Sequence, residues 1–212
     1  FRQAYAPAYR LVKAAYAPLL PLLPEIDARL AQGKRTVLAI DGPCGSGKTT
    51  LAALLARLYD CPVFHADDFF LRPEQRTPAR FAEPGGNLDR ERLLEEVLAP
   101  LRQGQPVSFR RFDCHSLTLL PPVAVAPSSL AVVEGSYSLH PELAPMYDIS
   151  VCLTLSPELQ RRRILARNGE EMARRFFERW IPLEQAYFDA MKPQTRCGFL
   201  IEADQLSDEA PL

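Results

Sequence analysis

Residues 42 to 49 read Gly42-Pro43-Cys44-Gly45-Ser46-Gly47-Lys48-Thr49, which matches the pattern G-x-x-x-x-G-K-[ST] of a phosphate-binding loop. Ahead of the loop, residues 36–40 are apolar and partly β-branched, and they predict a short buried strand. Behind it, residues 50–58 consist mainly of strong helix formers. Strand, glycine loop and helix in this order are the setting that the pattern requires, so we expect the loop to bind phosphate.

The residue types in the loop explain this chemistry. Glycines let successive backbone N–H groups curl around a phosphate, and the helix N-terminus adds the positive end of its dipole. We expect Lys48 to reach the β- and γ-phosphates of a nucleotide and the Thr49 hydroxyl to bind Mg²⁺. The predicted nucleotide-binding residues are Gly42, Pro43, Cys44, Gly45, Ser46, Gly47, Lys48, Thr49 and Thr50.

The composition narrows the class of protein. With 212 residues, of which 47% are hydrophobic, the chain can bury the core of one domain with a small appendage. A formal net charge of −1 argues against a dedicated nucleic-acid binder. The five cysteines are odd in number and form no C-x-x-C pair, which is typical of reduced thiols rather than of a disulfide framework or a zinc site.

An apolar stretch over residues 14–23 faintly resembles a signal peptide, because Arg10 and Lys13 precede it. Prolines interrupt this stretch, and no part of the chain approaches the run of about 18 apolar residues that a membrane span needs. We therefore expect a soluble, cytoplasmic protein that does not bind a membrane. Residues 1–34 are predicted to form a helical leader, followed by one domain over residues 35–212.

Short apolar segments alternate with helical patterns along that domain. The predicted strands are residues 36–40, 61–65, 130–133, 149–153 and 199–201. The helices predicted after the first one are residues 89–103, 157–167 and 170–191. This alternation predicts an α/β fold in which a parallel sheet of about five strands has helices on both faces. Residues 71–86 are predicted to form a loop, and residues 105–129 short strands and loops over the site.

Three carboxylates directly follow predicted strands. Asp67 and Asp68 come after the second strand and Glu134 after the third. Ligands gather at the carboxyl ends of parallel strands, and a kinase needs one carboxylate there to orient the accepting hydroxyl and take its proton. We predict Asp67 as that base, with Asp68 as the alternative. We place Glu134 on the metal or substrate side, where it supports Mg²⁺ together with Thr49.

The helix predicted over residues 157–167 is crowded with arginines. Phosphoryl transfer spreads negative charge over the γ-phosphate oxygens, and a small mobile lid that carries arginines stabilises this charge and excludes water. Arg163 and Arg167 are four residues apart and share one face of the helix. We therefore predict both as catalytic residues on a lid, together with Lys48 and Asp67.

Other classes of nucleotide-binding protein lack support in the sequence. The chain contains no Asn-Lys-x-Asp segment, which argues against a GTPase. It contains no Leu-Ser-Gly-Gly segment, which argues against a transport ATPase. The chain is also short for the core of a motor or a helicase.

Taken together, several segments resemble the uridine kinase/phosphoribulokinase family of P-loop kinases, which is also similar to nicotinamide riboside kinase. These segments are residues 42–49, His65-Ala66-Asp67-Asp68-Phe69-Phe70, Asn87-Leu88-Asp89, Phe112-Asp113-Cys114-His115-Ser116, Val133-Glu134-Gly135 and the helix with Arg162, Arg163 and Arg167. The resemblance covers about residues 35–205. It implies a P-loop NTPase fold, ATP and Mg²⁺ as cofactors, and Asp67 as the catalytic base. It further implies that Asp89 holds ribose hydroxyls and that Phe112 and His115 contact the nucleobase.

The sequence departs from that family on the acceptor side. The segment over residues 112–115 is shorter than in uridine kinases, and Phe112 stands where a tyrosine is usual. The lid carries one extra residue between its arginines, and Asn168 replaces an expected aspartate. These changes lie in the substrate and lid regions, so the sequence defines the phosphate donor better than the acceptor.

We therefore expect a kinase that transfers the γ-phosphate of ATP to a hydroxyl of a small substrate, in the first place the 5′-hydroxyl of a nucleoside such as uridine. Nicotinamide riboside, pantothenate and a sugar phosphate are the alternative acceptors. A nucleotide-binding regulatory module without kinase activity is the alternative from another class. The sequence leaves open whether the chain forms a homo-oligomer.

Overall fold

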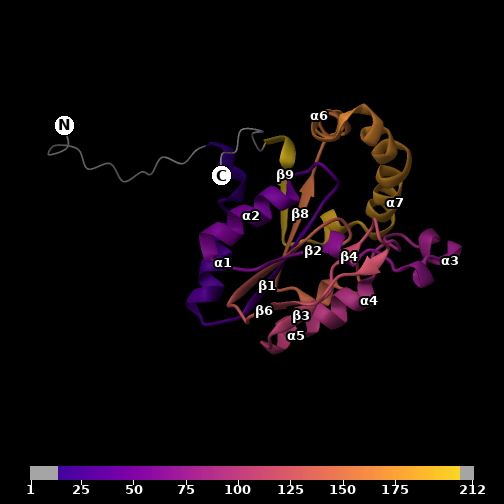
Figure 1. Cartoon of the computed structure of the whole chain (residues 1–212). Helices are drawn as coiled ribbons and strands as arrows, with labels where there is room; N and C mark the ends of the chain where they lie inside the picture. The colour runs from indigo at the N-terminus through magenta and orange to yellow at the C-terminus, as the bar shows by residue number, and fades with distance from the viewer. Residues whose placement is uncertain (1–13, 206–212) are drawn as a thin grey trace, which may run out of the picture.

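A five-stranded parallel sheet lies at the centre of the computed structural model, which describes residues 14–205 (Figure 1). The strands run in the order β2-β7-β1-β8-β9. Their bounds are β1 Thr36–Asp41, β2 Val63–His65, β7 Leu130–Glu134, β8 Ile149–Thr154 and β9 Phe199–Glu202. All five predicted strands thus form, in the parallel sheet that was expected. Residues 1–13 of the predicted leader and residues 206–212 of the predicted domain lie outside the described residues.

The register of the sheet aligns the ends of its inner strands. Ile40 of β1 lies opposite Glu134 of β7, and Glu134 in turn lies opposite His65 of β2. The two segments that follow β1 and β2 therefore start at the same edge of the sheet as the end of β7. This edge is where a parallel α/β sheet binds its ligands.

Successive residues of β1 pack against opposite faces of the sheet. Leu38 and Ile40 belong to a core that includes residues of α1 (Leu22–Ala31) and α2 (Lys48–Tyr59). Val37 belongs to the core on the other face. The helical elements of that second face are α4 (Arg90–Leu93), η4 (Leu94–Leu98), α5 (Ala99–Gln103) and α7 (Ile181–Met191).

The described part of the predicted leader contributes to the first of these cores. It consists of a 3₁₀ turn, η1 (Ala14–Leu19), and of α1. Leu22 and Ile26 of α1 are fully buried and share a core cluster with Leu51 and Leu55 of α2. Because this cluster also includes Leu38 and Ile40 of β1, helix α1 packs against both α2 and the sheet.

Two helical stretches contain a π-helical turn, and in each a proline follows two residues after that turn. The stretch predicted over residues 89–103 forms as α4, η4 and α5, with Pro100 after the turn. In the other, η6 (Phe176–Trp180) precedes Pro182. Proline has no N–H to donate to the carbonyl four residues back, which favours a local widening of the helix.

Two connecting segments contain short regular elements. Residues 71–86 contain a short helix, α3 (Pro78–Ala82), so the predicted loop is interrupted by one helical turn. The Thr77 hydroxyl caps it by accepting a hydrogen bond from Arg80 N at 3.1 Å. Residues 105–129 form two small antiparallel pairs: β3 (Val107–Phe109) with β6 (Val123–Val125), and β4 (Phe112–Asp113) with β5 (Thr118–Leu119).

Helix α6 (Pro157–Arg175) stands above the carboxyl end of β8, and α7 descends beside the sheet (Figure 1). Helix α6 is broken at Gly169, where φ is 70° and ψ is 170°. Side chains with a Cβ rarely adopt this backbone conformation, so glycine permits the break. The break falls between the two helices predicted over residues 157–167 and 170–191.

The buried position of α1 leads to a testable expectation. Replacing Ile26 by alanine should lower the free energy of unfolding by about 2 to 5 kcal/mol, because the substitution leaves a cavity in the core shared with α2. Urea denaturation followed by circular dichroism measures this. Leu58→Ala, at a side chain of α2 that is 55% exposed, is the matched control and should change the value little. Equal effects of the two substitutions would contradict the packing of α1.

Candidate active site

The phosphate loop joins β1 to α2, and its backbone depends on glycine at both ends. Gly42 has φ of 151°, and a Cβ placed there would lie 2.8 Å from the Leu153 carbonyl oxygen of β8. Gly47 has φ of 91° directly ahead of α2. The first glycine therefore permits close packing of the loop on β8, and the second permits the turn that aims α2 at the ligand.

A buried carboxylate that the sequence analysis missed anchors the start of this loop. Asp41, the last residue of β1, is fully buried and accepts four hydrogen bonds. Its Oδ1 accepts from Gly42 N (2.7 Å) and Tyr137 N (3.1 Å), and its Oδ2 from Leu139 N (2.8 Å) and the Tyr187 hydroxyl (2.7 Å). Complete burial raises the pKa of Asp41 to about 6, although the hydrogen bonds and the Lys48 cation oppose the shift.

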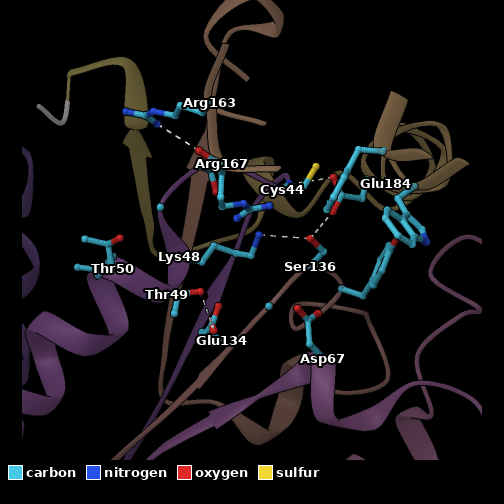
Figure 2. Close-up of a pocket in the computed structure, with 18 of the residues that line it drawn as sticks. Cys44, Lys48, Thr49, Thr50, Asp67, Glu134, Ser136, Arg163, Arg167 and Glu184 are labelled. Atoms are coloured by element: carbon cyan, nitrogen blue, oxygen red, sulfur yellow. Dashed lines mark hydrogen bonds between the residues drawn. The ribbon is translucent and has the colours of Figure 1, made fainter. Parts of the chain in front are cut away.

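Lys48 lies back against the loop that precedes it. Its ammonium group donates to the carbonyl oxygens of Gly42 (2.8 Å) and Pro43 (3.1 Å) and to the Ser136 hydroxyl (3.3 Å). Ser136 follows β7 and donates to the Glu184 carboxylate on α7 at 2.6 Å. Figure 2 shows these side chains meeting on one side of the loop.

Thr49 and Glu134, the two residues predicted to bind Mg²⁺, lie within hydrogen-bond distance of each other. The Thr49 hydroxyl donates to Glu134 Oε1 at 3.1 Å, and His65 Nδ1 lies 2.6 Å from the same oxygen. The hydrogen bond to Glu134 raises the pKa of His65, and burial opposes this shift. Hydroxyl and carboxylate oxygens are the ligands that Mg²⁺ takes when phosphates and water complete its shell, so the pair fits this ion. Within residues 14–205 there is no cluster of three or more His, Cys, Asp or Glu side chains that could hold a metal ion by itself.

The structure distinguishes the two neighbouring aspartates that follow β2. Both lie on the 3₁₀ turn η2 (Ala66–Phe69), but only Asp67 lines the cavity next to the phosphate loop. Desolvation by the surrounding protein raises the pKa of Asp67, the Lys48 cation opposes the shift, and the charge of Glu134 adds to it. The backbone carbonyl of Asp68 accepts from Arg92 Nη2 at 2.9 Å, on the side of α4.

The predicted lid places its arginines over the phosphate loop. Arg162, Arg163 and Arg167 of α6 line the cavity, and Figure 2 shows the last two above Lys48. Arg163 Nη1 donates to the Gly45 carbonyl oxygen at 3.3 Å. Arg167 Nε donates to Asn168 Oδ1 at 2.9 Å, and its guanidinium lies 5.6 Å from the centre of the Phe176 ring. The arginines thus surround the loop that is predicted to hold phosphates.

One cavity of about 970 Å³ connects these groups. It is lined by the phosphate loop and the first turns of α2. Side chains from five further segments also line it: Phe70, Asn87, Cys114, Tyr137, Phe176 and Trp180. A cavity of this size holds two small molecules side by side, or one large one.

Three residues predicted to bind the acceptor do not line this cavity. Asp89 is fully buried, caps α4 by accepting from Arg92 N (3.1 Å) and pairs with Arg72 Nε at 3.3 Å. Phe112 is buried, with the Arg76 guanidinium 5.4 Å from its ring centre. His115 is exposed, and its N–H donates to Asp113 Oδ1 at 2.9 Å.

The cavity-lining residues that the sequence analysis did not select fall into two groups. Asn87 and Cys114 stand in the quoted segments, next to or near the residues that were chosen, so the segments were right even where other side chains face the cavity. Ser136, Tyr137, Trp180 and Glu184 belong to no segment that was assigned a binding role. That these side chains line the cavity follows from the fold and not from a local sequence pattern.

Known proteins identify the family. No family model matches the chain. A dephospho-CoA kinase of Rhodopseudomonas palustris is 30% identical over 143 residues, which are 63% of this chain and 71% of that protein. Uridine-cytidine kinase D of Dictyostelium discoideum is 28% identical over 122 residues, 55% of this chain and 23% of that protein. The chain belongs to the P-loop kinases.

Solved structures agree on the fold of this P-loop kinase. A protein described as a possible uridine kinase from Bacillus stearothermophilus superposes with a TM-score of 0.61 at 24% identity, over 85% of this chain and 99% of that chain. Two of the relatives are much longer proteins. The chain spans 23% of uridine-cytidine kinase D and 6% of a mycobactin import ATP-binding/permease protein of Mycolicibacterium smegmatis.

None of the helices in residues 14–205 is long and apolar enough to cross a membrane.

The buried carboxylate of Asp41 predicts a pH dependence of stability. A folded pKa of about 6, above the ordinary value of 3.8, means that its contribution is present below pH 4 and is lost as the pH rises through 6. The free energy of unfolding of the wild type, minus that of Asp41→Asn, should therefore fall by about 2 to 3 kcal/mol between pH 4 and pH 7. Urea denaturation at four pH values measures it. The exposed Asp189→Asn is the control, and a difference that stays constant or grows with pH for Asp41→Asn would contradict the assignment.

Proposed function

We propose that this P-loop kinase transfers the γ-phosphate of ATP to the hydroxyl of a nucleoside, in the first place the 5′-hydroxyl of uridine. One observation carries the proposal: the Asp67 carboxylate lines the same cavity as the phosphate loop and as four aromatic side chains. The loop suits the donor, and the aromatic side chains suit a flat acceptor. A carboxylate in the same cavity can take the proton that the hydroxyl must lose.

The donor site rests on the loop and the lid. The backbone N–H groups of the loop and the dipole of α2 attract phosphates, and Lys48 exchanges its loop carbonyls for phosphate oxygens. Arg163 and Arg167 approach the same region from α6 and stabilise the charge that develops on the transferring group. Thr49 and Glu134 would hold Mg²⁺, which neutralises part of the phosphate charge when it is bound.

Asp67 acts as the general base in this proposal. A carboxyl whose pKa is raised by desolvation accepts a proton more readily than a free aspartate, and its position orients the hydroxyl toward the donor. Lys48 and Glu134 lie close enough to influence its ionisation, so the base and the phosphate-binding groups share one electrostatic environment. Asp68 lies outside the cavity lining and is not needed for this step.

The aromatic lining of the cavity supports an acceptor with a planar ring. Phe70, Tyr137, Phe176 and Trp180 offer aromatic surface, and Asn87 offers an amide that can both donate and accept hydrogen bonds. An acceptor with a planar ring therefore suits this lining better than a sugar phosphate or pantothenate, neither of which has an aromatic ring.

The base assignment is tested with a pair of neighbouring variants. Asp67→Asn should lower turnover about 10²-fold or more while the dissociation constant of an ATP analogue stays within about twofold, because only proton transfer is lost. Asp68→Asn is the matched control and should retain most of the turnover. Rates of ADP release in the presence of the acceptor decide between them. Near-normal turnover of Asp67→Asn, or loss in Asp68→Asn alone, would reject Asp67 as the base.

The acceptor class is tested by ADP release across uridine, cytidine, nicotinamide riboside, pantothenate and sugar phosphates. We expect release with the nucleosides, and Trp180→Ala should raise the KM for that acceptor about tenfold or more, because base–aromatic stacking is lost. The KM for ATP should stay nearly unchanged. Phe177→Ala, an aromatic side chain of the same π-helical turn outside the cavity lining, is the control. Release with pantothenate or a sugar phosphate alone would replace the nucleoside by that acceptor, and no release with any of them would favour a regulatory module.

A further inference from the structure

The phosphate loop of this structure already holds a negatively charged group from the protein. The carboxylate of Glu184 accepts a hydrogen bond from Cys44 N, a backbone amide of the loop, at 2.9 Å. Its other oxygen accepts from the Ser136 hydroxyl at 2.6 Å. Glu184 is 7% exposed and lies on α7, 140 residues from Cys44 along the chain. Acidic side chains are seldom buried without dedicated partners, so the burial of Glu184 at the loop indicates a specific contact.

The same loop residue is also held from the helix on the other side of the Gly169 break. Gln160 of α6 donates from Nε2 to the Cys44 carbonyl oxygen at 2.9 Å. Helices α6 and α7 therefore bind one peptide unit each on either side of Cys44, through its carbonyl and its N–H respectively. A change in the position of Cys44 therefore alters a hydrogen bond to each of these two helices.

A terminal phosphate and the Glu184 carboxylate compete for the same place. The N–H groups of such a loop point toward the ligand, and Cys44 and Glu184 both line the cavity. Ser136 links the carboxylate to the Lys48 ammonium, which is the group expected to meet the β- and γ-phosphates. One N–H cannot serve both anions well, and two anions at hydrogen-bond distance repel each other.

We propose that Glu184 is a positioning residue that stands in for the terminal phosphate of the donor and is displaced when ATP binds. This inference rests on the proposed donor site. Displacement removes one of the contacts between α7 and the loop, and α7 continues directly from the turn that carries the cavity-lining Trp180. Binding of the donor is thereby coupled to the position of Trp180.

The test compares two nucleotides that differ in the terminal phosphate. Trp180 is the single tryptophan of the chain, so its fluorescence reports binding of AMPPNP or ADP, each with Mg²⁺, to the full-length protein. In Glu184→Gln the dissociation constant of AMPPNP should fall about tenfold or more, since the like charge next to the terminal phosphate is gone, whereas that of ADP should change much less. Glu178→Gln removes the same charge from an exposed position of the preceding turn and should leave both constants unchanged.

The outcomes separate this inference from the proposed function. Equal weakening of both nucleotides in Glu184→Gln would mean a merely structural role, and unchanged binding would mean that the carboxylate does not face the terminal phosphate; either result overturns the inference while the kinase proposal stands. Failure of the wild-type protein to bind either nucleotide overturns both. If Glu184→Gln does not fold, Glu184→Asp replaces it, because its side chain is one methylene shorter and no longer reaches Cys44 N. The dissociation constant of AMPPNP should then fall relative to that of ADP, as in Glu184→Gln.

Discussion

The four hydrogen bonds to the buried carboxylate of Asp41 hold together the parts from which the site is built. They fix the first peptide of the phosphate loop, two backbone amides of the segment after β7, and the Tyr187 hydroxyl of α7. A carboxylate removed from water is costly unless donors surround it, so each of these segments has one geometry that satisfies it. The loop, the segment after β7 and helix α7 are therefore placed relative to one another by a single side chain.

Because Tyr187 is tied to Asp41, Glu184 one turn earlier on α7 is brought to the loop, and Ser136 after β7 lies between Glu184 and Lys48. The result is a continuous polar network from the core of the sheet to the phosphate loop and the lid. Polar networks in a low-dielectric interior are specific when every member has a partner. In this P-loop kinase, Asp67, the arginines of α6 and the aromatic side chains line the remainder of the cavity.

Much of the fold was predictable from local patterns. The strands and most of the helices followed from periodicity, and the loop from its glycines. The boundary between the helices predicted over residues 157–167 and 170–191 coincides with the break at Gly169. The pairing of Thr49 with Glu134 followed from the rule that ligands collect at the carboxyl ends of parallel strands. These inferences depend on residues near in sequence or on sheet topology, and both are encoded in short stretches.

The acceptor side was not predictable in the same way. Asp89 serves as a buried helix cap paired with arginines, and the hairpin that carries Phe112 and His115 presents Cys114 to the cavity instead. Which residue of a turn faces inward depends on the turn's conformation, which composition does not define. The contact of Glu184 with Cys44 spans 140 residues and has no periodic signal at all.

Transfer of the γ-phosphate of ATP to a ring-bearing hydroxyl acceptor can be followed by ³¹P NMR of the wild-type protein with MgATP and uridine. We expect the resonance of a nucleoside monophosphate ester to grow as the γ-phosphate resonance of ATP disappears. Inorganic phosphate as the only new product, or a spectrum that does not change, would contradict the proposed transfer.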